Sequence, residues 1–169
     1  MNFSLVDFKL EHAYSLAFYA NNEKIANNLR NVFPHPYFYE DACDFIKISE
    51  NTLTKAIIIN EEAVGSISVT PKDDVNSKVA EIGYWLGEPF WNKGIMTEAI
   101  SEMVKLAFNK YDIIKIYAEP FEDNIGSCKA LEKAGFTLEA ILKDNIYKNN
   151  EIKNSFIYSI FREDLNGKD

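Results

Sequence analysis

The clearest periodic pattern in this chain is that of a helix. Along one face of residues 97–109 and the turn before it, apolar residues recur at three- and four-residue spacing, as in an amphipathic helix. They are Ile95, Ala99, Met103, Leu106 and Ala107. Weaker helical spacing predicts further helices over residues 11–19, 23–29 and 40–50. Two prolines and four aromatics in residues 31–39 indicate a loop before the last of these.

Strand-like segments alternate with these helices and predict a sheet. They cover residues 3–8, 55–60, 63–70, 78–86 and 113–119, and two more follow residue 136, the last near residues 155–162. Residues 60–62 predict a tight hairpin. A helix capped by Asp123 or Asn124 should run to Ala134 and end at Gly135. This order of elements favours an α/β or α+β sheet, flanked by the two longest helices.

Length and charge narrow the classes of function. A single domain over residues 1–169 is expected, because no repeat, low-complexity segment or linker interrupts the chain. The formal net charge of −8 argues against nucleic acid and anionic membranes as partners. It either favours a cationic partner or simply keeps the protein soluble.

The few cysteines and histidines limit the chemistry further. Cys43 and Cys128 show neither a disulfide framework nor metal-ligand spacing, and there are only two histidines, so no metal site is expected. No apolar run approaches the ~20 residues of a membrane span, and residues 1–4 are not a signal peptide. We therefore expect a cytoplasmic enzyme or binding domain.

The segment that follows residues 78–86 is a candidate phosphate site. A turn through Asn92, Lys93 and Gly94 leads into the first turn of the long helix. Amides at a helix N-terminus suit a phosphate group, and glycine lets the backbone approach a ligand closely. By itself the pattern is equally that of a tight turn. Neither a P-loop nor the three-glycine dinucleotide fingerprint is present, which argues against a kinase-like or Rossmann fold.

A second motif, residues 124–136, follows the strand that ends at Glu119. Together with residues 91–99 it resembles the GNAT superfamily of acyl-CoA-dependent N-acetyltransferases. The resemblance is closest to the RimJ/RimL-like branch, which includes ribosomal-protein N-terminal acetyltransferases. Further segments look like the same branch, so the resemblance covers most of the chain; they are residues 36–42, 81–84 and 158–160.

The resemblance implies a fold and a cofactor. The fold is a mixed, strongly twisted sheet of six to seven strands, flanked by helices, whose central strands splay apart to bind CoA. The first motif of the family holds the CoA pyrophosphate, and the second lines the pantetheine arm. The implied co-substrate is acetyl-CoA. On this chain the implied cofactor-binding residues are Trp85, Leu86, Asn92, Lys93, Gly94, Ile95, Met96, Thr97, Asn124, Ser127 and Lys129.

The chain departs from the family at three positions. Trp91 stands where much of the superfamily has Gln or Arg, and Met96 where it has Gly or Ala. Both are tolerable, since main-chain amides hold the pyrophosphate. Leu131 stands where many relatives carry a tyrosine regarded as the general acid. Ser127, one turn earlier, is either its catalytic replacement or a polar residue of a capped helix.

The resemblance also suggests a catalytic base. Glu81 lies on the strand that the family places beside the thioester, so it would accept the proton of the amine, directly or through water. A solvated strand carboxylate is the alternative interpretation, and Glu119 is a second candidate base. Backbone amides near Trp85 and Leu86 would polarise the carbonyl if the family's bulge leaves them unpaired.

Two other features remain open. The aromatic loop around His35 either covers an acceptor cleft or packs in the core. Cys128 is expected to be a core cysteine, because no histidine lies near it in sequence.

Three classes of function are compatible with these features. The first is an N-acetyltransferase that moves an acetyl group to a primary amine by direct attack. Its acceptor is a protein N-terminus or a small amine. The second is a non-catalytic acyl-CoA-binding regulator, which Leu131 favours, and the third is an interaction domain without a cofactor. Surface aromatics leave room for a homodimer.

Overall fold

The computed structural model describes residues 2–166. The chain forms two compact units: unit 1 consists of Met1–Ser68 and Tyr84–Ala99, and unit 2 of Val69–Gly83 and Ile100–Asp169. Strands β3 (Glu62–Pro71) and β4 (Val79–Leu86) and helix α4 (Ile95–Lys110) contribute residues to both units. Each unit is defined by itself, and the single domain expected over residues 1–169 stays a prediction.

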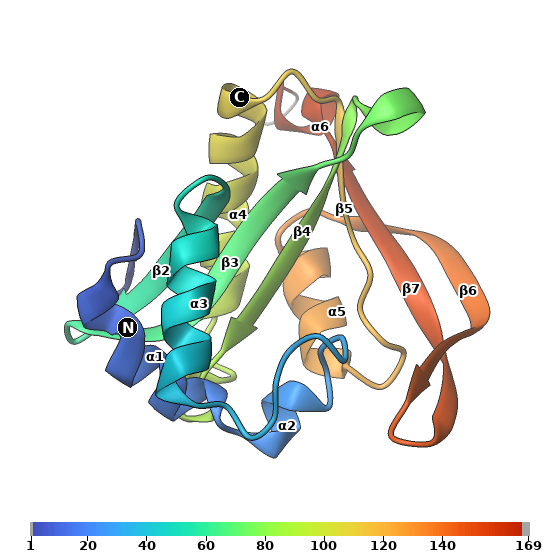
Figure 1. Ribbon diagram of the computed structural model, residues 1–169. Coiled ribbons are helices and arrows are strands. Elements are labelled where there is room, and N and C mark those ends of the chain that lie inside the picture. The colour runs from blue at the N-terminus through green and yellow to red at the C-terminus, as the bar shows by residue number, and fades with distance from the viewer. Residues whose placement is uncertain (1, 167–169) are drawn as a thin grey trace. The chain divides into compact units, whose positions relative to one another are not determined.

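The described strands form a seven-stranded mixed sheet, as the sequence predicts. Their order is β1-β2-β3-β4-β5-β7-β6 (Figure 1). Antiparallel pairing joins β1 to β2, β5 to β7 and β6 to β7. A parallel pair joins β4 to β5.

Unit 1 places two helices against its strands. Its elements are β1 (Ser4–Val6), the 3-10 helix η1 (Leu10–His12), α1 (Ala13–Ala20), α2 (Glu23–Ala26), α3 (Tyr39–Ser49), β2 (Leu53–Ile59) and the 3-10 helix η3 (Glu88–Phe90), with parts of β3, β4 and α4. Helices α1 and α3 lie over the same face of β2 and β3 (Figure 1). Buried Leu16 and Ile46 from these helices meet Ala56 and Ala63 from the strands in one core cluster.

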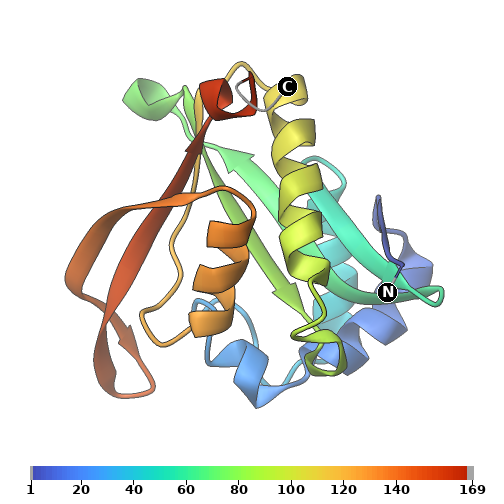
Figure 2. The same cartoon turned by 180° about the vertical axis from the view of Figure 1, so that it is seen from behind.

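Unit 2 contains the C-terminal strands. Its remaining elements are the 3-10 helix η2 (Asp74–Asn76), β5 (Lys115–Ala118), α5 (Ile125–Lys133), β6 (Thr137–Lys148), β7 (Glu151–Phe161) and α6 (Arg162–Asn166). Helix α5 and the later turns of α4 lie on one face of its strands (Figure 2). Strands β4, β5 and β7 bury Ala80, Ile82, Ile116, Ala118 and Ile160. Glu81 and Tyr117 point to the opposite face, because side chains alternate along a strand.

The parallel pairing of β4 with β5 is short. It joins Val79–Glu81 to Lys115–Tyr117, and its last pair is Glu81 with Tyr117. Strand β4 nevertheless continues to Leu86. The two central strands therefore stop pairing partway along β4, in agreement with the predicted splaying.

The β2–β3 hairpin confirms the predicted tight turn. Its two loop residues, Asn60 and Glu61, have φ angles of 50° and 67°. A two-residue loop with positive φ at both positions is a type I′ turn, which matches the twist of the paired strands.

Among the differences from the sequence prediction, three have a physical explanation. Helix α2 ends at Ala26 rather than at residue 29, because asparagines such as Asn27 compete with the helix for backbone hydrogen bonds. Strand β7 begins at Glu151, well before residue 155, because it pairs with β6 along polar residues. Helix α6 was not predicted; Asp164 supports its start by accepting a hydrogen bond from Phe161 N (2.8 Å).

Strand β3 and the end of β4 approach closely in unit 1. Gly87 N–H donates to the Val64 carbonyl oxygen (2.7 Å). A Cβ added at Gly65 would lie 2.5 Å from the Trp85 carbonyl oxygen and 3.1 Å from Leu86 Cα. Both neighbours are backbone atoms that cannot rotate away, so position 65 requires glycine.

Replacing Gly65 by Ala is therefore expected to destabilise the protein by about 1–3 kcal/mol, as overpacking does. Gly126→Ala is the matched control, because its Cβ meets nothing within 4 Å and alanine is the better helix former. Urea unfolding measures both variants. Equal stabilities would contradict the close approach at Gly65.

Candidate active site

The connection from β4 to α4, in unit 1, is a turn with two left-handed residues. Asn92 has a φ of 60° and Gly94 a φ of 78°, and α4 begins at Ile95. The helical hydrogen bond from Glu98 N reaches Gly94 O (3.2 Å). The amides of Ile95 and Met96 lie ahead of this bond, at the positive end of the helix dipole. A Cβ at Gly94 would meet nothing within 4 Å, so the backbone there is accessible to a ligand.

Two side chains of this turn are held by the turn itself. Trp91 Nε1 donates to the Leu86 carbonyl oxygen (2.7 Å). Lys93 Nζ donates to the Pro89 carbonyl oxygen (2.8 Å) and lies 5.7 Å from the centre of the Phe90 ring. The indole N–H of Trp91 is thus already engaged by the protein's own backbone. The predicted contact of Lys93 with a phosphate would need this ammonium to leave Pro89.

The aromatic loop before α3 packs in part against the core, which is one of the two interpretations left open by the sequence. Tyr37 is buried, and the Phe33 ring packs edge-on against Trp85 with 6.0 Å between ring centroids. Phe38 and His35 are exposed. The loop therefore contributes to the core of unit 1 and also presents side chains to solvent.

Helix α5, in unit 2, begins with the predicted cap. Asn124, rather than Asp123, is the cap residue, and its Oδ1 accepts a hydrogen bond from Ser127 N (3.3 Å). Ser127 is half-buried and Lys129 is exposed. Gly135 ends the helix with a φ of 96°, as predicted.

Two buried residues of α5 bear on catalysis. Leu131, at the position of the family's tyrosine, is fully buried, so its side chain belongs to the core. Cys128 is buried as well, and this burial raises the pKa of its thiol. A protonated, buried thiol is a poor nucleophile, in line with the expected core cysteine.

Glu81 lies in a network of three side chains on one face of unit 2. Its Oε2 accepts hydrogen bonds from Lys72 Nζ (2.6 Å) and from the Tyr117 hydroxyl (3.2 Å). The Glu81 side chain is 17% exposed. It is thus largely buried and paired with a cation, which differs from the solvated carboxylate considered above. Sequence reasoning missed Lys72 and Tyr117, because no local pattern links them to Glu81.

Glu119, the second candidate base, is bound by neutral groups. Its Oε1 accepts hydrogen bonds from Asn145 Nδ2 and from Ser155 Oγ, both at 2.8 Å. Asn145 Nδ2 also donates to Ser155 Oγ (3.0 Å). Glu119 therefore belongs to a polar cluster that joins β6 and β7 to the end of β5.

The predicted cofactor-binding residues and the candidate base Glu81 divide between the units. Unit 1 holds the group on β4 and α4: Trp85, Leu86, Asn92, Lys93, Gly94, Ile95, Met96 and Thr97. Unit 2 holds Glu81, Asn124, Ser127 and Lys129. Within each unit, the predicted residues that are close in sequence also share one connection or helix start. That the residues of the two units form one CoA site stays a prediction.

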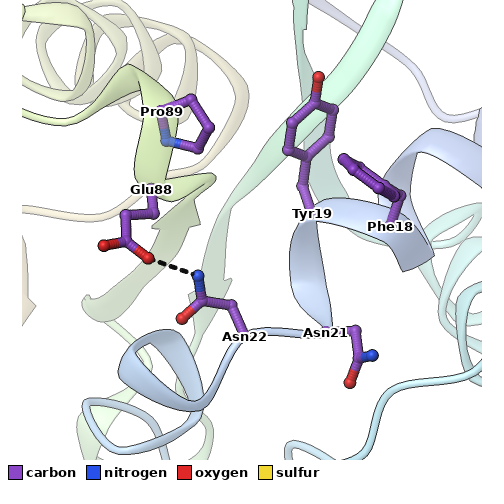
Figure 3. Close-up of a pocket in the computed structure, with 6 residues that line it drawn as sticks. All are labelled: Phe18, Tyr19, Asn21, Asn22, Glu88 and Pro89. Carbon is purple, nitrogen blue, oxygen red and sulfur yellow. Dashed lines mark hydrogen bonds between the residues drawn. The ribbon is translucent and has the colours of Figure 1, made fainter.

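A cavity of about 330 Å³ lies in unit 1, beside residues that precede the turn into α4. Its lining residues are Phe18, Tyr19, Asn21, Asn22, Glu88 and Pro89 (Figure 3). Glu88 Oε2 accepts a hydrogen bond from Asn22 Nδ2 (2.8 Å), and Lys24 pairs with the same carboxylate. The hydrogen bond from Lys24 lowers the pKa of the Glu88 carboxyl. The acidic group of this cavity is thus already neutralised from within unit 1.

Residues 2–166 contain neither a metal-ligand cluster nor a membrane-spanning helix. In this part of the chain, no three His, Cys, Asp or Glu side chains gather as a metal ion would need. Over the same residues, no helix combines the length and apolar character needed to cross a membrane.

Comparison with known proteins identifies the family. Residues 2–137 match the sequence profile of the acetyltransferase (GNAT) domain. The chain therefore belongs to the GNAT acetyltransferase family, as its two motifs indicated.

Individual relatives agree with the RimJ/RimL-like branch. The chain is 29% identical over 118 residues to the putative ribosomal N-acetyltransferase YdaF of Bacillus subtilis; the match covers 70% of this chain and 64% of YdaF. The chain thus spans about three fifths of the length of the curated relatives that it matches.

Solved structures confirm the fold. The microcin C7 self-immunity acetyltransferase MccE, in complex with acetyl-CoA and AMP, has a TM-score of 0.81 and 28% identity, over 94% of this chain and 92% of that one. RimL, a ribosomal L7/L12 α-N-protein acetyltransferase in complex with coenzyme A, has a TM-score of 0.80 and 21% identity, over 95% and 94%.

The left-handed turn before α4 yields a stability prediction. Gly94→Ala should cost about 1–2 kcal/mol, because a Cβ is disfavoured at positive φ even where space is open. Gly94→Asn should cost less, since asparagine tolerates this conformation, as Asn92 does here. Chemical unfolding compares the two variants. Equal losses would contradict the left-handed conformation at this position.

Proposed function

We propose that this chain transfers an acetyl group from acetyl-CoA to the N-terminal amine of a protein. The family match over residues 2–137 is the observation that supports acetyl transfer. The protein acceptor is supported by the relatives, since YdaF and RimL are both named for acetylation of ribosomal proteins. The cytoplasm is the compartment we propose for this activity.

The backbone at the start of α4 would hold the cofactor's pyrophosphate. Amides of Ile95 and Met96 at the helix N-terminus suit an anion. The open space at Gly94 lets phosphate oxygens approach the main chain. Asn124 and Ser127 at the start of α5, with exposed Lys129, would contact the pantetheine arm and the outer phosphates.

Glu81 would accept the proton that the acceptor amine must lose before it can attack. The bound cofactor would supply the acetyl group: the amine nitrogen would bond to the thioester carbonyl carbon and give up a further proton, the C–S bond would break, and the thiolate would leave and take up a proton. Amides near Trp85 and Leu86 would donate to the carbonyl oxygen as negative charge develops on it. Ser127 is the candidate donor to the sulfur, and Glu119 the alternative base.

A non-catalytic acyl-CoA-binding regulator is the second candidate. The fully buried Leu131 favours it, because the side chain at the position of the family's tyrosine cannot donate a proton. A homodimer also stays a prediction. Tyr14 and Phe18, four residues apart on α1, are 74% and 75% exposed and would suit such an interface.

Binding of CoA is tested first. A ligand at 100 times its dissociation constant stabilises the folded state by about 2.7 kcal/mol, so CoA should raise the melting temperature measurably. Both the enzyme and the regulator predict this shift. Its absence would favour an interaction domain that does not bind the cofactor.

Catalysis is tested by thiol release from acetyl-CoA with a panel of peptides and small amines. Glu81→Gln should lower kcat by about 10²-fold, at the lower end of what general base catalysis contributes, with little change in CoA affinity. Glu139→Gln is the matched control, because Glu139 is also paired with a lysine, Lys115. A CoA-induced shift without turnover of any amine would favour the regulator, and turnover of small amines only would replace the protein acceptor.

A further inference from the structure

Strands β4 and β5 and the residue that follows β3 bring Glu81, Tyr117 and Lys72 to one face of unit 2. Glu81 and Tyr117 are direct partners in the β4–β5 register. Lys72 follows the end of β3, and its N–H donates to the Val79 carbonyl oxygen (2.9 Å). Val79 and Glu81 share a face, so Lys72 lies diagonally across from Glu81, within reach of a long side chain.

Each of the three side chains contacts the other two. Lys72 Nζ and the Tyr117 hydroxyl donate to the same atom, Glu81 Oε2 (2.6 and 3.2 Å). Lys72 Nζ also lies 5.7 Å from the centre of the Tyr117 ring, within the range of a cation–π contact. One oxygen of Glu81 is thus held both by the residue that follows β3 and by a residue of β5.

Burial makes the ammonium group necessary at this place. The Glu81 side chain is only 17% exposed, and a carboxylate taken out of water destabilises the protein unless a charge compensates it. Lys72, 37% exposed, supplies that charge and keeps part of its own hydration. The hydrogen bond to Glu81 raises the pKa of Lys72, so the ammonium stays protonated at neutral pH.

The network lies where the pairing of the central strands ends. Glu81 with Tyr117 is the last pair of the parallel register, and β4 continues beyond it. A second ion pair on the same face joins Lys115 to Glu139 (2.7 Å). Lys115 is the partner of Val79, so it lies two positions along the register from the pair Glu81 and Tyr117. Charge pairing thus occurs twice on this face, but the network of Lys72 includes the proposed base.

We propose that Lys72 is a positioning residue for Glu81. It holds the Glu81 carboxylate in one orientation and supplies the opposite charge beside it, with Tyr117 as the second support. This inference rests on the proposed function, in which Glu81 takes the proton of the acceptor amine. Lys72 acts through Glu81 and contributes no proton transfer of its own.

The test combines single and double variants in the thiol-release assay. Lys72→Met removes the charge and should lower kcat about tenfold, within the range found for residues that share a hydrogen-bond network, while KM for acetyl-CoA stays the same. Lys72→Arg keeps the cation and should retain activity within about threefold of the wild type. In a Glu81→Gln background, Lys72→Met should have no further effect.

Lys115→Met is the matched control, because it breaks a similar ion pair on the same face without touching Glu81. It should keep wild-type kcat. The inference is overturned if Lys72→Met behaves like Lys115→Met, or if it lowers kcat equally in the wild-type and Glu81→Gln backgrounds. The melting temperature with and without CoA shows that each variant is folded.

Failure of the proposed function has a different signature. In that case the wild type itself acetylates none of the peptides or amines. The positioning role is then overturned too, and coupling between Lys72→Met and Glu81→Gln in the free energy of unfolding would define the pair as structural only.

Discussion

The hydrogen bonding of β4 is the constraint on which the candidate site depends. On the side of β3, β4 remains in contact up to its C-terminal end. There the Gly87 N–H donates to the Val64 carbonyl oxygen, and Gly65 allows the two backbones to approach closely. Towards β5 its pairing ends at Glu81. Peptide groups beyond that point need other hydrogen-bond partners. Trp91 provides one of them by donating to the Leu86 carbonyl oxygen. An extended ligand could provide others, as the pantetheine arm is expected to do.

The same strand leads into the phosphate turn, and here the charge of the protein matters. The chain carries a formal net charge of −8, which opposes the approach of an anion such as CoA. Lys93 donates to its own turn at Pro89. Affinity for phosphate would therefore rest on amides at the start of α4, whose geometry is fixed by the left-handed conformations of Asn92 and Gly94. Such binding depends on backbone shape more than on side-chain charge, which explains why an acidic chain can be expected to hold the cofactor.

Features of the fold that depend on residues adjacent in sequence could be predicted, whereas features that depend on contacts between distant segments could not. The cap at Asn124, the helix end at Gly135 and the turn after β2 follow from residues adjacent in sequence, and all three are confirmed. The early start of β7 depends on pairing with β6, which no local pattern encodes. The same holds for the site. Glu81 could be singled out by the resemblance of its strand to the family, but its partners lie elsewhere in sequence. Lys72, just beyond β3, and Tyr117, on β5, meet it only through the register of the sheet.

The buried Leu131 is compatible with catalysis because the leaving group is a thiolate. An alkyl thiol such as that of cysteine has a pKa of about 8.5, so its anion is stable enough to leave near neutral pH without a strong acid. The amine is more demanding, because an N-terminus has a pKa near ~8 and remains partly protonated at neutral pH. The protein must therefore supply a base more than an acid. In the proposed mechanism the chain does so with one carboxylate, Glu81, which Lys72 and Tyr117 hold at the place where β4 and β5 stop pairing.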